Sequence, residues 1–156
     1  MRLVLRAGGA LRTGPERDLV DDYLGRARGL ARGLGFLDVE EHSVDLGKCR
    51  SRADETEKIV GGVPRDAAVF VLDERGKSLT SRQLSDALVR LRDEGRPSSV
   101  FLIGGADGFD PAALPSGIRK ISFGSQTWPH KLVRVMLAEQ IYRALTILAG
   151  TPYHRD

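Results

Sequence analysis

AAVFVLDERGKSLTSRQLSDALVRLRDEGRPSSVFLIGG, residues 67–105, holds two apolar runs on either side of one helical pattern. AAVFVL at 67–72 is a compact apolar run, as in a strand buried on both faces of a sheet, and SSVFLIG at 98–104 predicts another buried strand. DERGK predicts a turn after the first run, and Thr80 with Gln83 matches a capping box. One helical stripe follows and ends near Gly95, formed by Leu84, Ala87, Leu88 and Leu91. This order predicts a βαβ unit with parallel strands.

The flanking sequence repeats the alternation of strand and helix. Strands are predicted at 1–7, 36–44 and 119–123, and helices at about 13–34, 54–60 and 129–149. We therefore predict one α/β domain over residues 1–156, with a mainly parallel sheet flanked by helices. Because such sheets bind ligands beyond the carboxyl ends of their strands, the loops after Leu72, Ile103 and Phe123 are the candidate site.

Composition limits the class of protein. Of 156 residues, 41% are hydrophobic and 29% are charged, which is typical of a soluble globular chain. No apolar run has the length of a membrane span, the amino-terminal apolar stretch is too short for a signal peptide, and Cys49 is the single cysteine. We therefore expect a cytoplasmic protein. The net charge of +3 favours anionic partners, although the excess of 19 Arg over 5 Lys also fits GC-rich codons.

Two loops carry candidate binding chemistry. LIGGADGFD, residues 102–110, is neither a P-loop nor a GxGxxG fingerprint, so its glycines indicate either a tight turn or a ligand lying against bare backbone. FGSQTWPH, residues 123–130, could hold an adenine or a carboxylate at the entrance of the last helix. For Thr127 the sequence favours an ordinary helix cap.

The sequence gives little support for metal binding or for hydrolase chemistry. His42, His130 and His154 lack the spacing of metal ligands, so we predict no metal site. Ser125 does not lie in a GxSxG elbow, which argues against an esterase-type nucleophile. Carboxylates that follow strands, such as Asp73, Glu74 and Asp107, are more typical of solvated turns than of a catalytic pair.

The last helix is apolar around most of its circumference. Its apolar members are Val135, Met136, Leu137, Ile141, Tyr142, Leu145 and Leu148. A homodimer through this helix would explain the pattern, and so would deeper burial in the chain's own core.

Four motifs in this order resemble one known family. They are LDERGK at 72–77, FLIGGADGF at 101–109, FGSQTWPHKLVRVMLAEQIYRA at 123–144 and PYHR at 152–155. Together they resemble the bacterial 23S rRNA pseudouridine-N3 methyltransferases of the SPOUT class. The likeness covers the whole chain, is densest over 69–155 and is loose over 42–64. It implies a C-terminal trefoil knot that binds S-adenosylmethionine, a homodimer packed through the last helix, and methylation of N3 of a pseudouridine in 23S rRNA.

By position, the resemblance assigns cofactor contacts to three strand-end loops. These contacts are Leu72, Gly104, Gly105, Phe123, Gly124, Ser125, Gln126, Thr127 and Trp128. It also assigns activity to the tail, with Tyr153 ordering it while His154 and Arg155 hold the RNA and the target base. Asp156 is an addition to the family ending, which we expect to be tolerated or to pair with Arg155.

Two other functions are compatible with parts of the sequence. One is a non-catalytic ribosome-binding factor that keeps the knotted fold, and the other is a cytosolic nucleotide-binding enzyme of another kind. The intact GG, QTWPH and PYHR elements argue against the first. The second leaves the tail unexplained.

Overall fold

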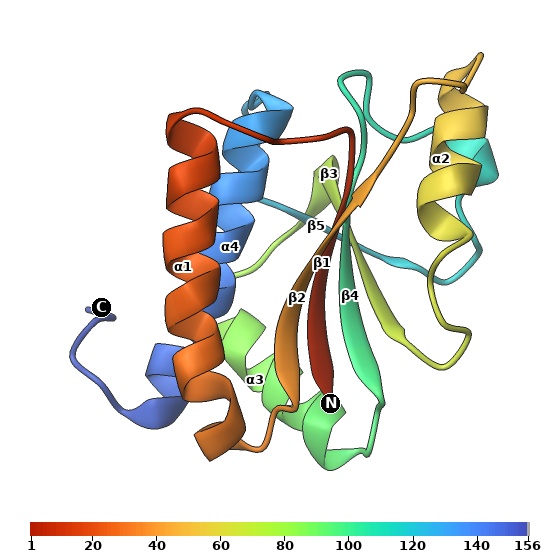
Figure 1. The fold of residues 1–156 in the computed structure, drawn as a ribbon. Helices are drawn as coiled ribbons and strands as arrows, with labels where there is room; N and C mark the ends of the chain where they lie inside the picture. The colour runs from red at the N-terminus through yellow and green to blue at the C-terminus, as the bar shows by residue number, and fades with distance from the viewer. Residues whose placement is uncertain (156) are drawn as a thin grey trace.

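The computed structural model describes residues 1–155, which form a five-stranded sheet with helices on both faces (Figure 1). The strand order is β2-β1-β4-β3-β5, and every neighbouring pair is parallel. The strands are β1 (Arg2–Gly8), β2 (Asp38–Val44), β3 (Ala68–Ser78), β4 (Ser98–Ile103) and β5 (Arg119–Ser122). The helices are α1 (Pro15–Ala31), α2 (Arg52–Val60), α3 (Ser81–Asp93) and α4 (His130–Ala149), with short 3-10 turns η1 (Arg32–Leu34) and η2 (Pro111–Ala113). The predicted parallel α/β class is confirmed.

Two apolar layers hold the sheet between its helices. On one face α1, α3 and α4 cover the strands, and Leu24, Leu88 and Ile141 from these helices are fully buried there (Figure 1). On the other face α2 covers the sheet through Ile59. Every residue of β4, its two serines included, is buried because helices lie on both sides of it, which confirms the predicted buried strand.

Local signals in the sequence set most of the helix ends. The Thr80 hydroxyl accepts from the backbone N–H of Gln83 at 3.1 Å, while the Gln83 side chain accepts from the N–H of Thr80 at 2.9 Å. This confirms the capping box. Gly150 ends α4 with a φ of 66°, a left-handed conformation that glycine adopts at little cost.

The turn predicted at residues 73–77 is partly wrong. Both Leu72 and Lys77 align with Ile121 of β5, so residues 73–76 bulge out of the sheet and the strand then resumes as far as Ser78. At the bulge the backbone passes very close to β5, since a Cβ added to Gly76 would lie 2.6 Å from backbone atoms of Ile121. The polar residues and the glycine of this bulge are visible in the sequence. No sequence signal indicates that the strand pairs with β5 again after the bulge.

Helix α4 packs between α1 and α3 within its own chain. This packing buries Val135, Leu137, Ile141 and Leu145, so the chain's own core accounts for much of the apolar circumference. Leu132 keeps 39% of its surface exposed near the start of the helix. The trefoil knot stays a prediction from the resemblance. Within the described residues, none of the helices combines the length and apolar character needed to cross a bilayer.

Candidate active site

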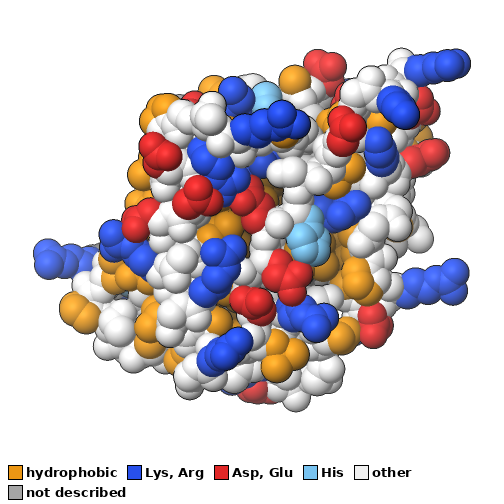
Figure 2. All heavy atoms as spheres, viewed as in Figure 1, with side chains coloured by type: hydrophobic (Ala, Val, Ile, Leu, Met, Phe, Trp, Pro, Cys, Tyr) orange, Lys and Arg blue, Asp and Glu red, His pale blue; other side chains and the backbone are white. Residues whose placement is uncertain are grey.

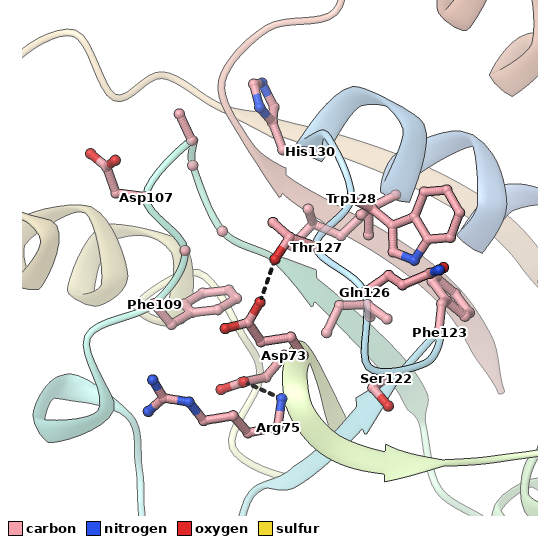
Figure 3. Close-up of a pocket in the computed structure, with 18 of the residues that line it drawn as sticks. Asp73, Arg75, Asp107, Phe109, Ser122, Phe123, Gln126, Thr127, Trp128 and His130 are labelled. Carbon is pink, nitrogen blue, oxygen red and sulfur yellow. Dashed lines mark hydrogen bonds between the residues drawn. The ribbon is translucent and has the colours of Figure 1, made fainter.

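A cavity of about 380 Å³ lies beside the bulge of β3 and the carboxyl ends of β4 and β5 (Figure 3). Three loops enclose it, namely the bulge at 73–76, the turn at 104–109 and the segment at 123–128. These are the loops expected from the rule that parallel sheets bind ligands beyond their carboxyl ends. Its volume is that of a site for a small cofactor.

The predicted cofactor contacts gather around this one cavity. Those lining it are Leu72, Gly104, Gly105, Phe123, Gly124, Gln126, Thr127 and Trp128. Ser125 is the exception, because it is exposed and does not line the cavity.

The glycine turn after β4 is tight because its two sides approach each other closely. A Cβ added to Gly104 would lie 2.8 Å from the backbone carbon of Gly108, and Gly105 and Gly108 form an isolated bridge. The Gly108 N–H also donates to the Gly105 carbonyl at 3.0 Å. The tight-turn interpretation is therefore confirmed, and the ligand interpretation stays a prediction for a loop that forms one wall of the cavity.

Thr127 joins two walls of the cavity. Its hydroxyl donates to Glu74 Oε2 at 3.1 Å, connecting the segment after β5 to the bulge of β3 (Figure 3). The helix-cap interpretation of Thr127 is wrong, because α4 begins at His130 after an N-cap at Pro129 and has no side-chain cap. Pro129 stiffens the segment before the helix, and the Thr127 hydroxyl is bonded across the cavity and not to the helix end.

Of the two carboxylates in the bulge of β3, Asp73 is less solvated than expected, whereas Glu74 is exposed. Asp73 accepts from the backbone N–H of Arg75 at 2.9 Å and lies 3.6 Å from the Lys120 ammonium, with 18% of its side chain exposed. Together with Glu74 it places negative charge at one side of the cavity. The sequence predicts simple turn residues at these positions, because the apolar run of the strand ends at Leu72.

Several lining residues escaped the sequence analysis. Phe109 adds an aromatic ring that points across the cavity toward Thr127, while Asp107 points outward (Figure 3). The others are Arg52 and Pro111 from flanking loops and helices, and His130 with Val133 at the start of α4. Helix spacing could have placed Val133 one turn after His130, but only the tertiary structure brings Arg52 from α2 to the same cavity.

A buried arginine fixes α4 beside the strand ends. Arg134 is 2% exposed and donates to the carbonyls of Gly9 at 2.9 Å and Gly8 at 3.4 Å. It also lies 3.3 Å from Glu41 Oε1, and burial lowers the pKa of its guanidinium. Arg17 of α1 pairs with the other oxygen of Glu41 at 2.7 Å. This network joins α1, α4 and the carboxyl ends of β1 and β2 into one support for the site.

The predicted catalytic tail is ordered, and it lies on its own helix. Tyr153 donates from its hydroxyl to Glu139 Oε1 at 3.1 Å, and its ring centroid lies 4.7 Å from the Arg143 guanidinium carbon. Arg143 Nη1 lies 3.3 Å from His154 Nδ1. Arg155 is exposed, and Asp156, with its expected pairing to Arg155, lies outside the described residues.

The tail and the cavity are at opposite ends of α4. His130 at the first turn lines the cavity, whereas Tyr153 follows the last turn (Figure 1). A helix of 20 residues is about 30 Å long. The structure thus brings together the predicted cofactor contacts but does not bring His154 or Arg155 to the cavity of the same chain.

No group of three His, Cys, Asp or Glu side chains within residues 1–155 could hold a metal ion.

Comparison with known proteins identifies the class of this fold and site. A family model described as "Predicted SPOUT methyltransferase" matches residues 1–154, and the chain belongs to that family.

Curated relatives extend the likeness over the whole chain. A protein of Maricaulis maris named "Ribosomal RNA large subunit methyltransferase H" is 51% identical over 156 residues, covering 100% of both chains. Proteins of the same name from Hyphomonas neptunium and Dinoroseobacter shibae are 49% and 50% identical, with 99% of each chain covered.

Proposed function

We propose that this protein methylates N3 of a pseudouridine in the 23S rRNA of the large ribosomal subunit, with S-adenosylmethionine as methyl donor, in the cytoplasm. Membership of a methyltransferase family sets the reaction class. The assignment of the substrate rests on one observation. About half of all residues are identical, over the full chain, to those of relatives named as methyltransferases of large-subunit ribosomal RNA.

The cavity fits the proposed methyl donor. When bound, S-adenosylmethionine supplies a methyl group that its sulfonium already activates. The Asp73 and Glu74 carboxylates suit a ligand with a positive centre and ribose hydroxyls, while Phe109 and Phe123 suit a flat base. The backbone of Gly124 can approach a ligand closely, because nothing lies within 4 Å of the place that its Cβ would take.

The protein's part in the reaction is positioning and the handling of one proton. Transfer to N3 needs the base held in line at near-contact distance, which can supply several kcal/mol. N3 must also lose its proton. The Arg155 cation could lower the pKa of N3, or His154 could accept the proton.

We propose that the active unit is a homodimer, in which the tail of one chain reaches the cavity of its partner. Support comes from the position of the tail, a helix length away from the cavity of its own chain. The partly exposed apolar side chains Leu132, Met136 and Ile147 on α4 offer contacts for a second copy.

One experiment tests the function directly. Large subunits or ribosomes from cells lacking the modification are incubated with the protein and tritiated S-adenosylmethionine, and the labelled nucleoside is identified by mass spectrometry. Labelled N3-methylpseudouridine is the expected product. Label on another nucleoside would overturn the assignment of the base, and cofactor binding in calorimetry without any transfer would favour a non-catalytic ribosome-binding factor.

A further inference from the structure

A second hollow, of about 500 Å³, lies around the amino ends of β3 and β5. The segment that follows α2 and the segment before β5 form its sides, and Val63, Val69 and Ile118 give it a partly exposed apolar surface. These side chains pack against the core on one side only, so the apolar surface remains open to a ligand. Its volume is in the range of small-molecule and nucleotide sites.

Arginines surround this apolar surface. Arg65, Arg96 and Arg119 all line the hollow and are exposed, and the residues lining it within the described chain include neither Asp nor Glu. Two of the three are held by neighbours, since Arg96 donates to the Asp66 carbonyl at 3.5 Å and the Arg119 guanidinium lies 5.7 Å from the centre of the Phe70 ring. Planar guanidinium groups bind phosphate with two parallel hydrogen bonds and stack on bases.

Charge is more mixed on the face of the molecule shown in Figure 2. There, Lys and Arg side chains lie among Asp and Glu side chains. The hollow differs from that mixture, because it combines three arginines with an apolar floor and no lining carboxylate. Its chemistry is complementary to a phosphate attached to a flat, weakly polar base.

The hollow lies near the candidate active site. Strand β5 connects them, because Arg119 at its start lines the hollow and Ser122 at its end lines the cavity. At about 3.3 Å per residue the two sites are roughly 10 Å apart along the strand. One RNA chain of a few nucleotides can therefore contact both.

We propose that this hollow binds a single-stranded nucleotide of the substrate RNA, at a short distance from the base that is methylated. The inference rests on the proposed function, to which it adds a second contact that fixes the RNA. Arg65 and Arg96 bind the phosphate, and the base lies on the apolar surface beside Arg119.

Charge reversal at the edge of the hollow tests the proposal. We compare Arg65→Glu and Arg96→Glu with Arg32→Glu, a matched control at an exposed arginine outside both cavities. With unmodified large subunits as substrate, we expect KM to rise about tenfold for the first two variants, with kcat and cofactor affinity unchanged. The control should change KM by less than about twofold. In a plot of the logarithm of the binding constant against the logarithm of salt concentration, each test variant should have a slope about one unit shallower.

Equal KM values for the test and control variants would overturn the inference, while leaving the proposed function standing. If the unaltered protein transfers no methyl group, the proposed function fails, and filter binding of the same subunits to the three variants still decides whether the hollow binds RNA. Photo-crosslinking identifies the class of partner. A crosslink from residues 60–69 to rRNA supports the proposal, whereas a crosslink to a ribosomal protein overturns it.

Discussion

Tyr153 donates its hydroxyl hydrogen bond to Glu139 Oε1, at 3.1 Å, from a position 14 residues further along the chain. The same Glu139 oxygen accepts two hydrogen bonds from Arg143, which lies over the Tyr153 ring and close to His154. One turn of α4 thus organises the start of the tail. This contact makes an otherwise exposed chain end into a defined structure, because each polar group in it has a charged partner.

Substitutions at Tyr153 should show a graded loss of methylation. Tyr153→Phe keeps the ring over Arg143 but loses the hydrogen bond, so we expect kcat to fall about fivefold to tenfold, roughly 1 kcal/mol. Tyr153→Ala should lower it further. Steady-state methylation of unmodified large subunits measures the effect, and Glu139→Gln should resemble Tyr153→Phe. Glu57→Gln, an exposed change on α2, is the control, and an equal loss in that variant would contradict the role of the contact.

Removal of residues 153–156 should leave a folded dimer that cannot methylate. The helix before the tail ends at its own left-handed cap, Gly150, so the core does not depend on the tail. Light scattering would report the mass, calorimetry the cofactor affinity and tritium transfer the activity. Full-rate methylation by the shortened protein would show that the tail is dispensable.

His154→Ala and Arg155→Ala should separate two ways of handling the N3 proton. If His154 accepts the proton, only His154→Ala removes one titrating limb from the pH profile of single-turnover methylation. If Arg155 instead lowers the pKa of the base, Arg155→Ala shifts the limb to higher pH. Unchanged profiles in both variants would exclude both residues from the proton transfer.

Tyr153 should ionise later than an ordinary tyrosine. Burial, and then the hydrogen bond to the Glu139 carboxylate, raise the pKa of its phenol above the usual value of 10.0. A group with a raised pKa in the folded state stabilises the fold fully below its unfolded pKa, and this contribution is lost as pH rises toward the folded value. Above about pH 10, the advantage in unfolding free energy of the parent over Tyr153→Phe should therefore shrink. In a pH titration followed by tyrosinate absorbance, Tyr153→Phe should lack the tyrosine that ionises at the highest pH. An unchanged titration would contradict the raised pKa of Tyr153.

Gly76→Ala should damage both stability and the cavity. The new methyl group would lie 2.6 Å from the Ile121 backbone, and relief of such overlap typically costs about 1–3 kcal/mol. Because the preceding residues 73–75 line the cavity, a shift of the bulge should lower cofactor affinity as well. Gly25→Ala is the matched control, since nothing lies near its Cβ within α1 and helix propensity predicts a gain of about 0.5–1 kcal/mol. Chemical denaturation measures both, and a neutral Gly76→Ala would show that the bulge can yield.

The sequence predicted the elements well wherever the signal was local. Thr80 with Gln83 began α3 and Gly150 ended α4, because caps act through neighbouring backbone groups. The apolar residues VFLI of β4 predicted a buried strand, and alternation of strands with helices predicted the parallel sheet. Arg134 gave no local sign of its role, since its partners Gly8, Gly9 and Glu41 are more than 90 residues away.

The residues alone determined the order of strands and helices along the chain, because periodicity and capping are short-range effects. That order also indicates the edge of the sheet where a ligand can bind. Only the tertiary structure decided that residues 73–76 leave and rejoin β5, that Thr127 contacts Glu74, and that the tail lies a helix length from its own cavity. These features depend on contacts between distant segments, which form when burial of the shared core brings the segments together.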